Sequence, residues 1–264
     1  MSRLRSLLDF FWLAAFAAIV LTMQLRSGRS ATTDASLPLD LQSGEQRQGL
    51  YRSGQRLGTV TFAVRRSGKS WRVRHHFELG KGGTQRAAEV SMQLRADLSL
   101  AHLRLEADLG VVAQLAGLPP LMMRELAAGG PAQLRLEGDC VSETGVCQLV
   151  GGLGRRHLSL PITAGRGPVL TGTIYPLLAR GSLGRKAEVT IFDPLSLRQH
   201  VVAFQIEGDE RLRPLHGGPT VEAIRVSRDL SGIATRVWID RRGTVLREEM
   251  PLGFTLEHES WRPL

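Results

Sequence analysis

The sequence predicts a mainly β protein of the α+β class: a curved antiparallel sheet or half-barrel, two short helical insertions and one N-terminal transmembrane helix. From about residue 48 onward, apolar and polar residues alternate, as in Val60, Phe62 and Val64, and a period of two is typical of strands. The 29 Gly and 12 Pro residues are scattered, as in a chain that turns often. We expect about eleven to thirteen strands, and an antiparallel sheet of that size usually curls or splits.

Residues 7–25, "LLDFFWLAAFAAIVLTMQL", predict a transmembrane anchor, with Asp9 as their one charge. Nineteen residues at a rise of 1.5 Å nearly match the ~30 Å hydrocarbon core of a bilayer. Basic residues flank the run on both sides and give no clean orientation (Arg3, Arg5, Arg26 and Arg29). A short basic N-terminus before a long domain favours residues 1–6 in the cytoplasm. We therefore expect a single-pass protein of the bacterial inner membrane, with its main domain in the periplasm.

A cleaved signal peptide is the competing interpretation, because Ala15-Phe16-Ala17 has the small-x-small pattern of a cleavage site. Residues 26–47 are rich in Ser, Thr, Gly and Asp and predict a linker. The extracytoplasmic β domain is then expected over residues 48–264.

Two stretches depart from the period of two. Residues 111–130, "VVAQLAGLPPLMMRELAAGG", space their apolar residues helically on either side of a Pro-Pro pair. Residues 172–184, "GTIYPLLARGSLG", predict a second short helix in which Tyr175, Leu178 and Ala179 share a face.

Cys140 and Cys147 are the only cysteines, and they flank "VSETGV", a turn-forming segment. A hairpin there would bring the two side chains together, so we expect a disulfide. Two free buried thiols are the alternative. A disulfide would agree with an oxidising, extracytoplasmic location.

The formal charge of +9 does not make this chain a nucleic-acid binder. Three basic residues are Lys and the other 31 are Arg, a bias that a GC-rich genome produces by codon usage alone. The arginines are spread along the chain, without the interleaved aromatic residues of a base-stacking surface. Weak attraction to anionic lipid surfaces is the better interpretation, and we expect no nucleic-acid partner.

Several short motifs resemble a family of periplasmic β proteins. They are Tyr51, Gly54 and Gly58 near the start, Phe192-Asp193-Pro194, and Trp238, Asp240, Gly243, Val245 and Leu246 near the end. The chain resembles lipoprotein-carrier-like (LolA-like) domains over about 180 of its 264 residues. It is also similar to the N-terminal domain of bacterial membrane-anchored transglutaminase-like proteins. The resemblance implies a curved sheet closed by helices around an apolar cavity, with carrier or binding activity.

No motif in the sequence indicates catalysis, a metal or a cofactor. His75 and His76 are adjacent, so on a strand they face opposite sides and only one of them can join a given site, even with Glu78. The glycine-rich segments 80–84 and 152–158 lack the Lys-Ser/Thr ending of a phosphate loop. We therefore expect no enzyme, no metal site and no cofactor.

Two functions remain. In the first, the sheet holds lipid or a lipidated ligand in an apolar cavity, with "LPPLMMREL" as a lid. The expected lining comprises large apolar side chains, which would otherwise simply pack the core (Phe62, Trp71, Phe77, Leu105, Met122, Met123, Phe204 and Trp238). In the second, the domain is an anchored protein–protein interaction module or accessory subunit of a cell-envelope complex, which docks a partner through strand edges or arginines.

Overall fold

The structure is a computed structural model that describes residues 41, 43–80, 86–108, 111, 133–153, 156–165, 171–194, 197–230, 233–250 and 253–262. The expected anchor, most of the expected linker and nearly all of the first helical insertion, with Met122 and Met123, lie outside these residues. Within them, no helix has the length and apolar character needed to cross a bilayer.

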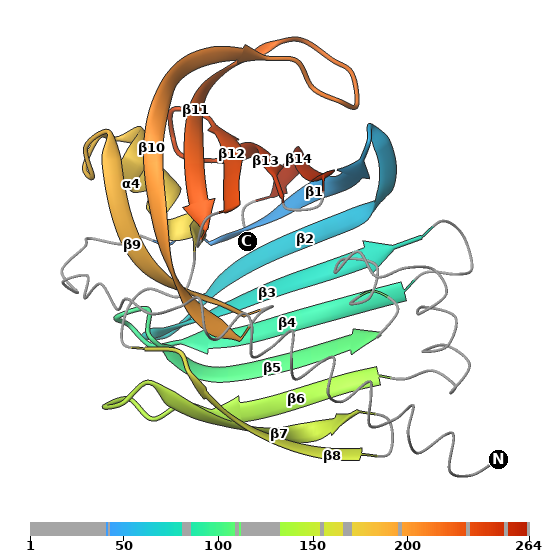
Figure 1. The fold of residues 1–264 in the computed structure, drawn as a ribbon, viewed down its shortest axis with the longest axis vertical. Helices are drawn as coiled ribbons and strands as arrows, with labels where there is room; N and C mark the ends of the chain where they lie inside the picture. The colour runs from blue at the N-terminus through green and yellow to red at the C-terminus, as the bar shows by residue number, and fades with distance from the viewer. Residues whose placement is uncertain are drawn as a thin grey trace. The chain divides into compact units, whose positions relative to one another are not determined.

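The described residues form a 14-stranded antiparallel sheet with one short helical segment, which confirms the mainly β prediction (Figure 1). The strands are β1 (Gly44–Arg52), β2 (Gln55–Ser67), β3 (Ser70–Leu79), β4 (Arg86–Leu94), β5 (Leu100–Asp108), β6 (Gln133–Asp139), β7 (Val146–Leu153), β8 (Arg156–Thr163), β9 (Lys186–Asp193), β10 (Arg198–Leu212), β11 (Val221–Leu230), β12 (Ile233–Ile239), β13 (Val245–Glu249) and β14 (Phe254–Arg262). The helical segment comprises η2 (Thr171–Thr173) and α4 (Ile174–Ala179).

Nearly every strand pairs with its neighbours in the sequence, and the exception is the pair of β1 with β14. The order is β8-β7-β6-β5-β4-β3-β2-β1-β14-β13-β12-β11-β10-β9. Two meanders, β1–β8 and β9–β14, therefore meet at the centre through the first and last strands. The outermost strands are β8 and β9, and the sheet is not closed into a barrel.

Strand β1 begins at Gly44, inside the segment expected to be linker. Its residues are mostly polar, so apolar alternation did not predict this strand. It has a partner strand on each side: Gln46 pairs with Phe62 of β2 and with Trp261 of β14. The side chain of Gln46 is buried and donates a hydrogen bond from Nε2 to the carbonyl of Val245, at 2.9 Å. The first strand of the sequence is thus stabilised by its pairing with β2 and β14 and shows no apolar alternation.

The register places the apolar residues of β2–β7 on one face of the sheet. Val64 lies opposite Val73, which in turn lies opposite Met92 of β4. These residues join a buried cluster that extends to Leu149 of β7. Their sequence neighbours point to the other face, where charged side chains are half-buried or exposed.

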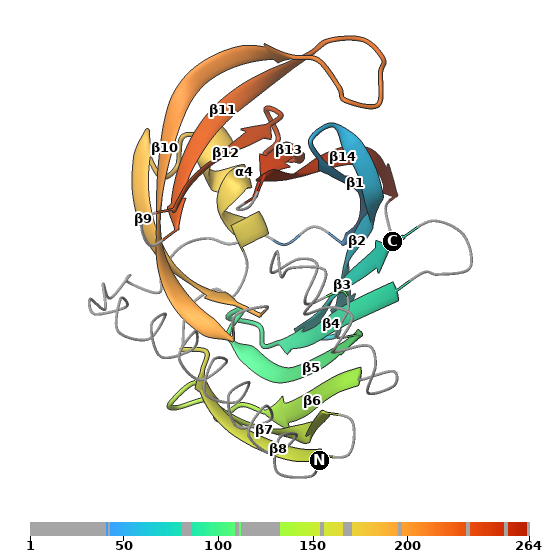
Figure 2. The same cartoon turned by 45° about the vertical axis from the view of Figure 1, so that its right-hand side comes forward.

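Strand β9 packs with both of its faces, because the sheet coils. Ile191 belongs to the core of the second meander, whereas its neighbour Phe192 belongs to the cluster of the first meander. Figures 1 and 2 both place the lower ends of β9 and β10 close to the inner side of the first meander. The curved inner surface of β2–β7, which we call the concave face, therefore receives one side of β9.

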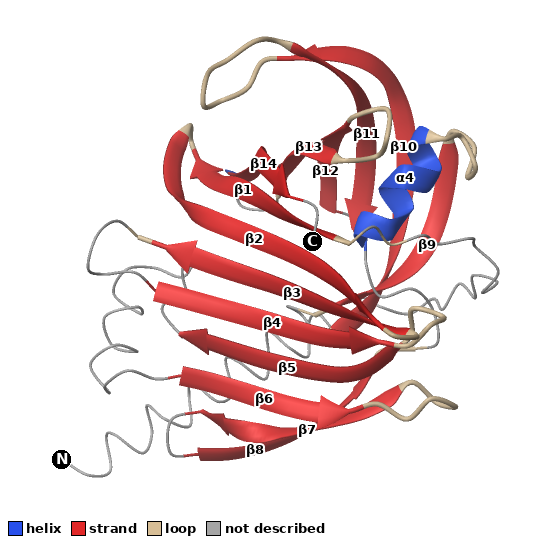
Figure 3. Ribbon diagram, turned by 180° about the vertical axis from the view of Figure 1, so that it is seen from behind, coloured by secondary structure: helices blue, strands red, loops and turns tan. Residues whose placement is uncertain are grey.

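Helix α4 covers one face of the second meander, the face that carries Val237 and Ile239 of β12. It buries Ile174, Tyr175 and Leu178 against β9–β12, and Ala179 packs partly buried against the same cluster, so the three residues predicted to share a face do so. Tyr175 meets Phe204 edge-on, with ring centroids 5.9 Å apart. Figure 3 shows α4 in blue. Gly181 ends the helix with a φ of 73°, and its N–H bonds to the carbonyl of Leu178.

Gly243 lets the β12–β13 turn approach this helix. Its φ is 86°, and a Cβ there would come within 2.4 Å of the Pro176 backbone, so only glycine fits. The carboxylate of Asp240 accepts hydrogen bonds from the N–H groups of Arg242 and Thr244, both at 2.8 Å. This is the Asp-x-x-Gly turn visible in the sequence.

Cys140 and Cys147 form a disulfide beside the β6–β7 turn, as predicted, and both are buried in the apolar cluster of the concave face, which we call the concave cluster. The bridge closes a short loop with a sequence separation of 7. Replacing both with Ser should lower the free energy of unfolding by roughly 2 kcal/mol, the low end for disulfides. A free-thiol assay on unreduced, denatured protein should find no reactive thiol; two would contradict the bridge.

Candidate functional site

The structure brings together four of the eight predicted lining residues. Phe62, Trp71 and Leu105 belong to the concave cluster, and Phe77 lies on the same face in an adjoining cluster. Leu105 and Phe77 are buried, whereas Phe62 and Trp71 are half-buried. The concave face of β2–β5 is therefore the part of the prediction that forms one surface.

The other described lining residues lie elsewhere. Phe204 is buried beneath α4 in the second meander. Trp238 lies on the opposite face of the sheet from Val237 and Ile239, where it packs with Leu212 and Ala223. It therefore shares no surface with Phe62, and the alternation of residues 237–239 was the signal for this separation.

Trp238 is held by polar partners on that opposite face. Its Nε1 donates a hydrogen bond to Glu210 at 3.2 Å, and the Arg247 guanidinium lies 5.9 Å from its ring centroid. Arg247 also pairs with the buried carboxylate of Glu257, which accepts hydrogen bonds from the β10–β11 loop. Trp238 thus packs on that face against side chains of β10, β11 and β13.

His75 lies in the middle of the concave face between aromatic rings. Its ring centroid is 4.7 Å from that of Phe62, edge-on, and 6.5 Å from that of Phe77, stacked. Its Nε2 atom is buried and has no hydrogen-bond partner among the described residues. Burial lowers the pKa of His75 to about 4, against a smaller opposing effect of Asp193. This imidazole is therefore neutral at pH 7.

Further polar groups continue this face across the central strands. Gln48 of β1 is buried and lies opposite His258 of β14. The Nε2 atom of His258 is also buried without a described partner, and burial lowers its pKa. A buried polar atom without a partner usually marks a missing hydrogen-bonding group. The sequence shows both histidines, but only the alternation around Phe77 places His75 on the apolar face.

A buried ion pair lies beneath α4. Arg228 donates hydrogen bonds to Glu248 at 2.6 Å, to Thr235 at 3.1 Å and, at the long limit of 3.5 Å, to Tyr175. Burial disfavours the charge of Arg228, but Glu248 and Tyr175 outweigh it and raise its pKa. For Tyr175, by contrast, burial itself raises the pKa, because it disfavours the charged phenolate. Ile224, Val226 and Arg228 are two residues apart on β11 and so share one face of the sheet. Because the first two are apolar, this spacing could have predicted that Arg228 is buried.

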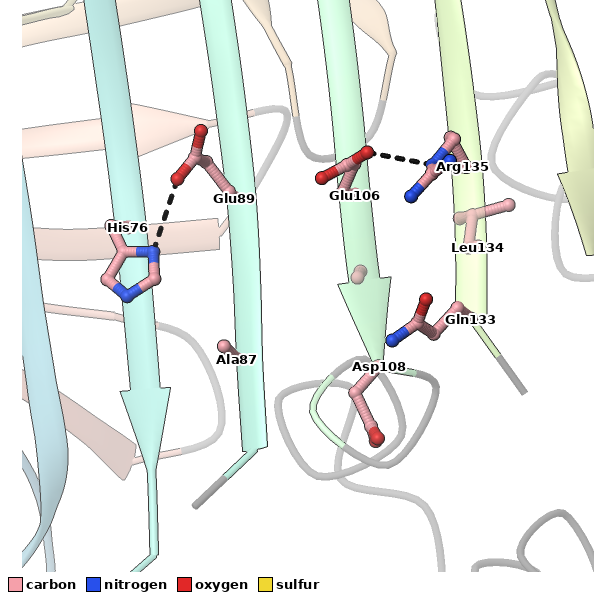
Figure 4. Close-up of a pocket in the computed structure, with 9 residues that line it drawn as sticks. His76, Ala87, Glu89, Glu106, Asp108, Gln133, Leu134 and Arg135 are labelled. Carbon is pink, nitrogen blue, oxygen red and sulfur yellow. Dashed lines mark ion pairs between the residues drawn. The ribbon is translucent and has the colours of Figure 1, made fainter. Parts of the chain in front are cut away.

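A polar hollow of about 210 Å³ lies on the other face of β3–β6 (Figure 4). His76 and Glu89 face each other across neighbouring strands at 3.4 Å, and Glu106 pairs with Arg135 at 2.7 Å. A hydrogen bond from Arg104 lowers the pKa of Glu106. The lining thus mixes the carboxylates of Glu89, Glu106 and Asp108 with the side chains of His76 and Arg135.

Several described histidines contact carboxylates. His76 points away from His75, as expected for adjacent strand residues, and His102 contacts Asp139 at 2.9 Å. Among the described residues, no group of three His, Cys, Asp or Glu side chains is placed to hold a metal ion.

Comparison with known proteins places the fold but not the activity. No family model matches the sequence, and a search of curated proteins finds no match. Among solved structures, the chain is similar to a beta-barrel-like protein of the domain of unknown function DUF1849 from Brucella abortus. The likeness covers 86% of this chain and 99% of that one, with 11% identity and a TM-score of 0.51. At this identity it shows a shared β-rich fold alone.

Proposed function

We propose that the chain is a membrane-anchored, extracytoplasmic, non-catalytic protein that binds lipid or a lipidated ligand on the concave face of β2–β5. Residues 7–25 would anchor it in a bacterial inner membrane, and the periplasm would hold the sheet. The disulfide supports an oxidising compartment. The β-rich fold is compatible with the lipoprotein-carrier-like resemblance.

One observation carries the proposal: large aromatic side chains remain half-buried on a face that is otherwise a closed apolar cluster. Phe62 and Trp71 pack against this cluster and yet keep exposed surface. His75 adds an unpartnered Nε2 between the rings. An acyl chain would cover the aromatic surface, and a neutral polar group such as an ester could meet the imidazole.

The charges near His75 indicate the kind of ligand. The imidazole is neutral at pH 7, and the charged group that acts on it most strongly is the negative Asp193. Neither feature attracts an anionic headgroup to the centre of this face. The apolar tail, rather than a phosphate, is therefore the part of a lipid that we place there.

Photo-crosslinking of the full chain in membranes tests this proposal. A fatty acid with a diazirine in mid-chain should label peptides of β2 and β3. The Phe62→Ser/Trp71→Ser variant should reduce that labelling severalfold, because it removes both half-buried rings. Ile233→Ser, which truncates an exposed apolar residue of β12, is the matched control and should leave it unchanged. Equal labelling in both variants, with both folded by circular dichroism, would overturn the assignment.

A second candidate, the anchored interaction module, is favoured by the exposed apolar side chains around β7 and β8. Five lie there: Val141, Val146, Val150, Leu158 and Leu160. The main chain of β8 is less suited to pairing. Ala164 donates to the carbonyl of Gly145, so the odd-numbered residues of β8 direct their main chain outward. Pro161 is one of them and lacks an N–H, which blunts this edge.

A further inference from the structure

The net positive charge of the chain comes almost entirely from one part of the sheet. Basic residues are spread along the sequence, but acidic residues are not, and none lies in residues 46–77. This stretch holds eight Arg and Lys residues, so it contributes +8 of the formal net charge of +9. It comprises most of β1, all of β2 and most of β3. The positive charge is therefore a local property of these three strands.

Three of the eight basic side chains have partners on β14. Arg47 and Arg56 both pair with Glu259, at 3.6 and 2.8 Å. The guanidinium of Arg52 lies 5.0 Å from the centroid of the Phe254 ring. These arginines are already held by the sheet.

Four others are exposed around the β2–β3 turn, and none has an ion pair within the part of the chain that the structure describes (Arg65, Arg66, Lys69 and Arg72). We call residues 65–72 the basic hairpin. Arg65 and Arg72 lie directly opposite each other, an arrangement of like charges that is unfavourable without an external anion. Gly68 has a φ of 60°, and a Cβ there would meet no atom within 4 Å, so the turn projects into solvent.

Trp71 adds an amphipathic ring to the basic hairpin. It is half-buried against the concave cluster, and the guanidinium of Arg66 lies 5.6 Å from its ring centroid. Tryptophan is typical of membrane–water interfaces, because its ring is apolar and its N–H is polar. The hairpin therefore combines unpaired cations with a side chain suited to the headgroup region of a bilayer.

The neighbouring turns at this end of the sheet are not basic. The β4–β5 turn holds one residue of each sign, Arg95 and Asp97, and the β6–β7 turn exposes Glu143. The positive surface is therefore confined to the basic hairpin.

The chain enters the sheet beside this hairpin. Strand β1 begins at Gly44, which pairs with Val64, the neighbour of Arg65. Leu41, just before β1, is buried in the concave cluster. Residues 26–40 separate it from the expected anchor, and fifteen residues span at most about 50 Å. An anchored chain would thus keep the basic hairpin within reach of the bilayer.

We propose that the basic hairpin docks on the surface of an anionic phospholipid bilayer, with its four cations at the lipid phosphates and Trp71 in the headgroup region. Each basic residue near such a surface strengthens binding roughly fivefold, and four act together here. This docking goes beyond the proposed acyl site and does not depend on it. The charges would hold the hairpin at the surface whatever the concave face binds.

Lys69 makes the contact measurable, because Lys186 at the start of β9 is an exposed lysine of the other meander and serves as an internal reference. The full chain in lipid nanodiscs is treated with an uncharged amine-reactive ester, and mass spectrometry measures the labelling rate of each lysine. Lys69 should react at least about fivefold more slowly in phosphatidylglycerol than in phosphatidylcholine. Lys186 should react equally fast in both.

Salt provides a second readout of the same contact. Sodium chloride at about 1 M shortens the Debye length to about 3 Å and should abolish the difference at Lys69. Equal rates at Lys69 in the two lipids at low salt would overturn the proposal. A difference that survives 1 M salt would also contradict docking by charge.

Two variants of equal charge separate the hairpin from the total charge. Arg65→Gln/Arg66→Gln/Arg72→Gln should let Lys69 react equally fast in both lipids. Arg211→Gln/Arg213→Gln/Arg242→Gln removes three exposed arginines from the second meander and should keep the difference.

With both variants folded by circular dichroism, a difference that persists in the first variant would contradict the proposal. A difference lost in both would show that the total charge, rather than the hairpin, controls binding, and would also overturn it. Acyl labelling of β2 and β3 in phosphatidylcholine should be unchanged in the hairpin variant, so the two sites fail or succeed separately.

Discussion

Replacement of Arg228 by Met is expected to lower the free energy of unfolding by about 3 to 5 kcal/mol, the cost of leaving one member of a buried ion pair alone. Arg228 is 8% exposed, and it is the partner that neutralises Glu248 beneath α4. Its loss also leaves the hydroxyl groups of Tyr175 and Thr235 without their donor. Chemical denaturation at pH 7, followed by circular dichroism, measures the change.

Two controls identify the cause. The double variant Arg228→Met/Glu248→Leu removes both charges and should recover much of the lost stability, because no unpaired charge remains buried. Arg211→Met breaks the pair of Arg211 with Glu222, which is mostly exposed, and should change stability little. If the double variant loses as much free energy of unfolding as the two single variants added together, the loss comes from packing and not from an unpaired charge.

The second large effect concerns His75 and acid. Its pKa is about 4 in the folded chain and near 6.5 when unfolded, so the unfolded chain binds the extra proton first. The contribution of His75 to the free energy of unfolding is therefore complete above pH 6.5 and is lost as the pH falls towards 4. The loss amounts to about 3 kcal/mol over this window. We expect denaturation midpoints to fall over this range.

His75→Phe keeps a ring between Phe62 and Phe77 but cannot bind a proton. Its stability should depend less steeply on pH between 6.5 and 4 than that of the unaltered chain. Burial also lowers the pKa of His200 and His258, so a smaller dependence should remain. His157→Phe, on exposed β8, is the control and should keep the full slope. An unaltered slope in His75→Phe would show that the His75 imidazole is not buried in solution.

The sequence predicted local structure better than tertiary pairing. The alternation of Val60, Phe62 and Val64 identifies a strand and its apolar face because both are local properties. It does not show that Gln46 lies in a central strand, since β1 pairs there with β14, the strand farthest from it in the described sequence. The start of the domain was therefore expected four residues late.

The candidate site was predictable only in part, for the same reason. Phe62, Trp71, Phe77 and Leu105 share a face because their strands are consecutive and their registers follow from short turns. Trp238 was predicted to join them only because it is large and apolar. It follows Val237 directly on the strand, so the alternation of side chains already placed it on the other face. The burial of Phe192 against the first meander depends on the coiling of the whole sheet, which alternation cannot reveal.

Mass spectrometry of lipids extracted from the purified full chain tests the central claim most directly. We expect the unaltered protein to retain more acyl-bearing lipid than the Phe62→Ser/Trp71→Ser variant, purified in the same way. Any lipid bound by residues 7–25 would be common to both proteins and would cancel in this comparison. The same amounts and kinds of lipid on both proteins, with both folded, would contradict binding on the concave face of β2–β5.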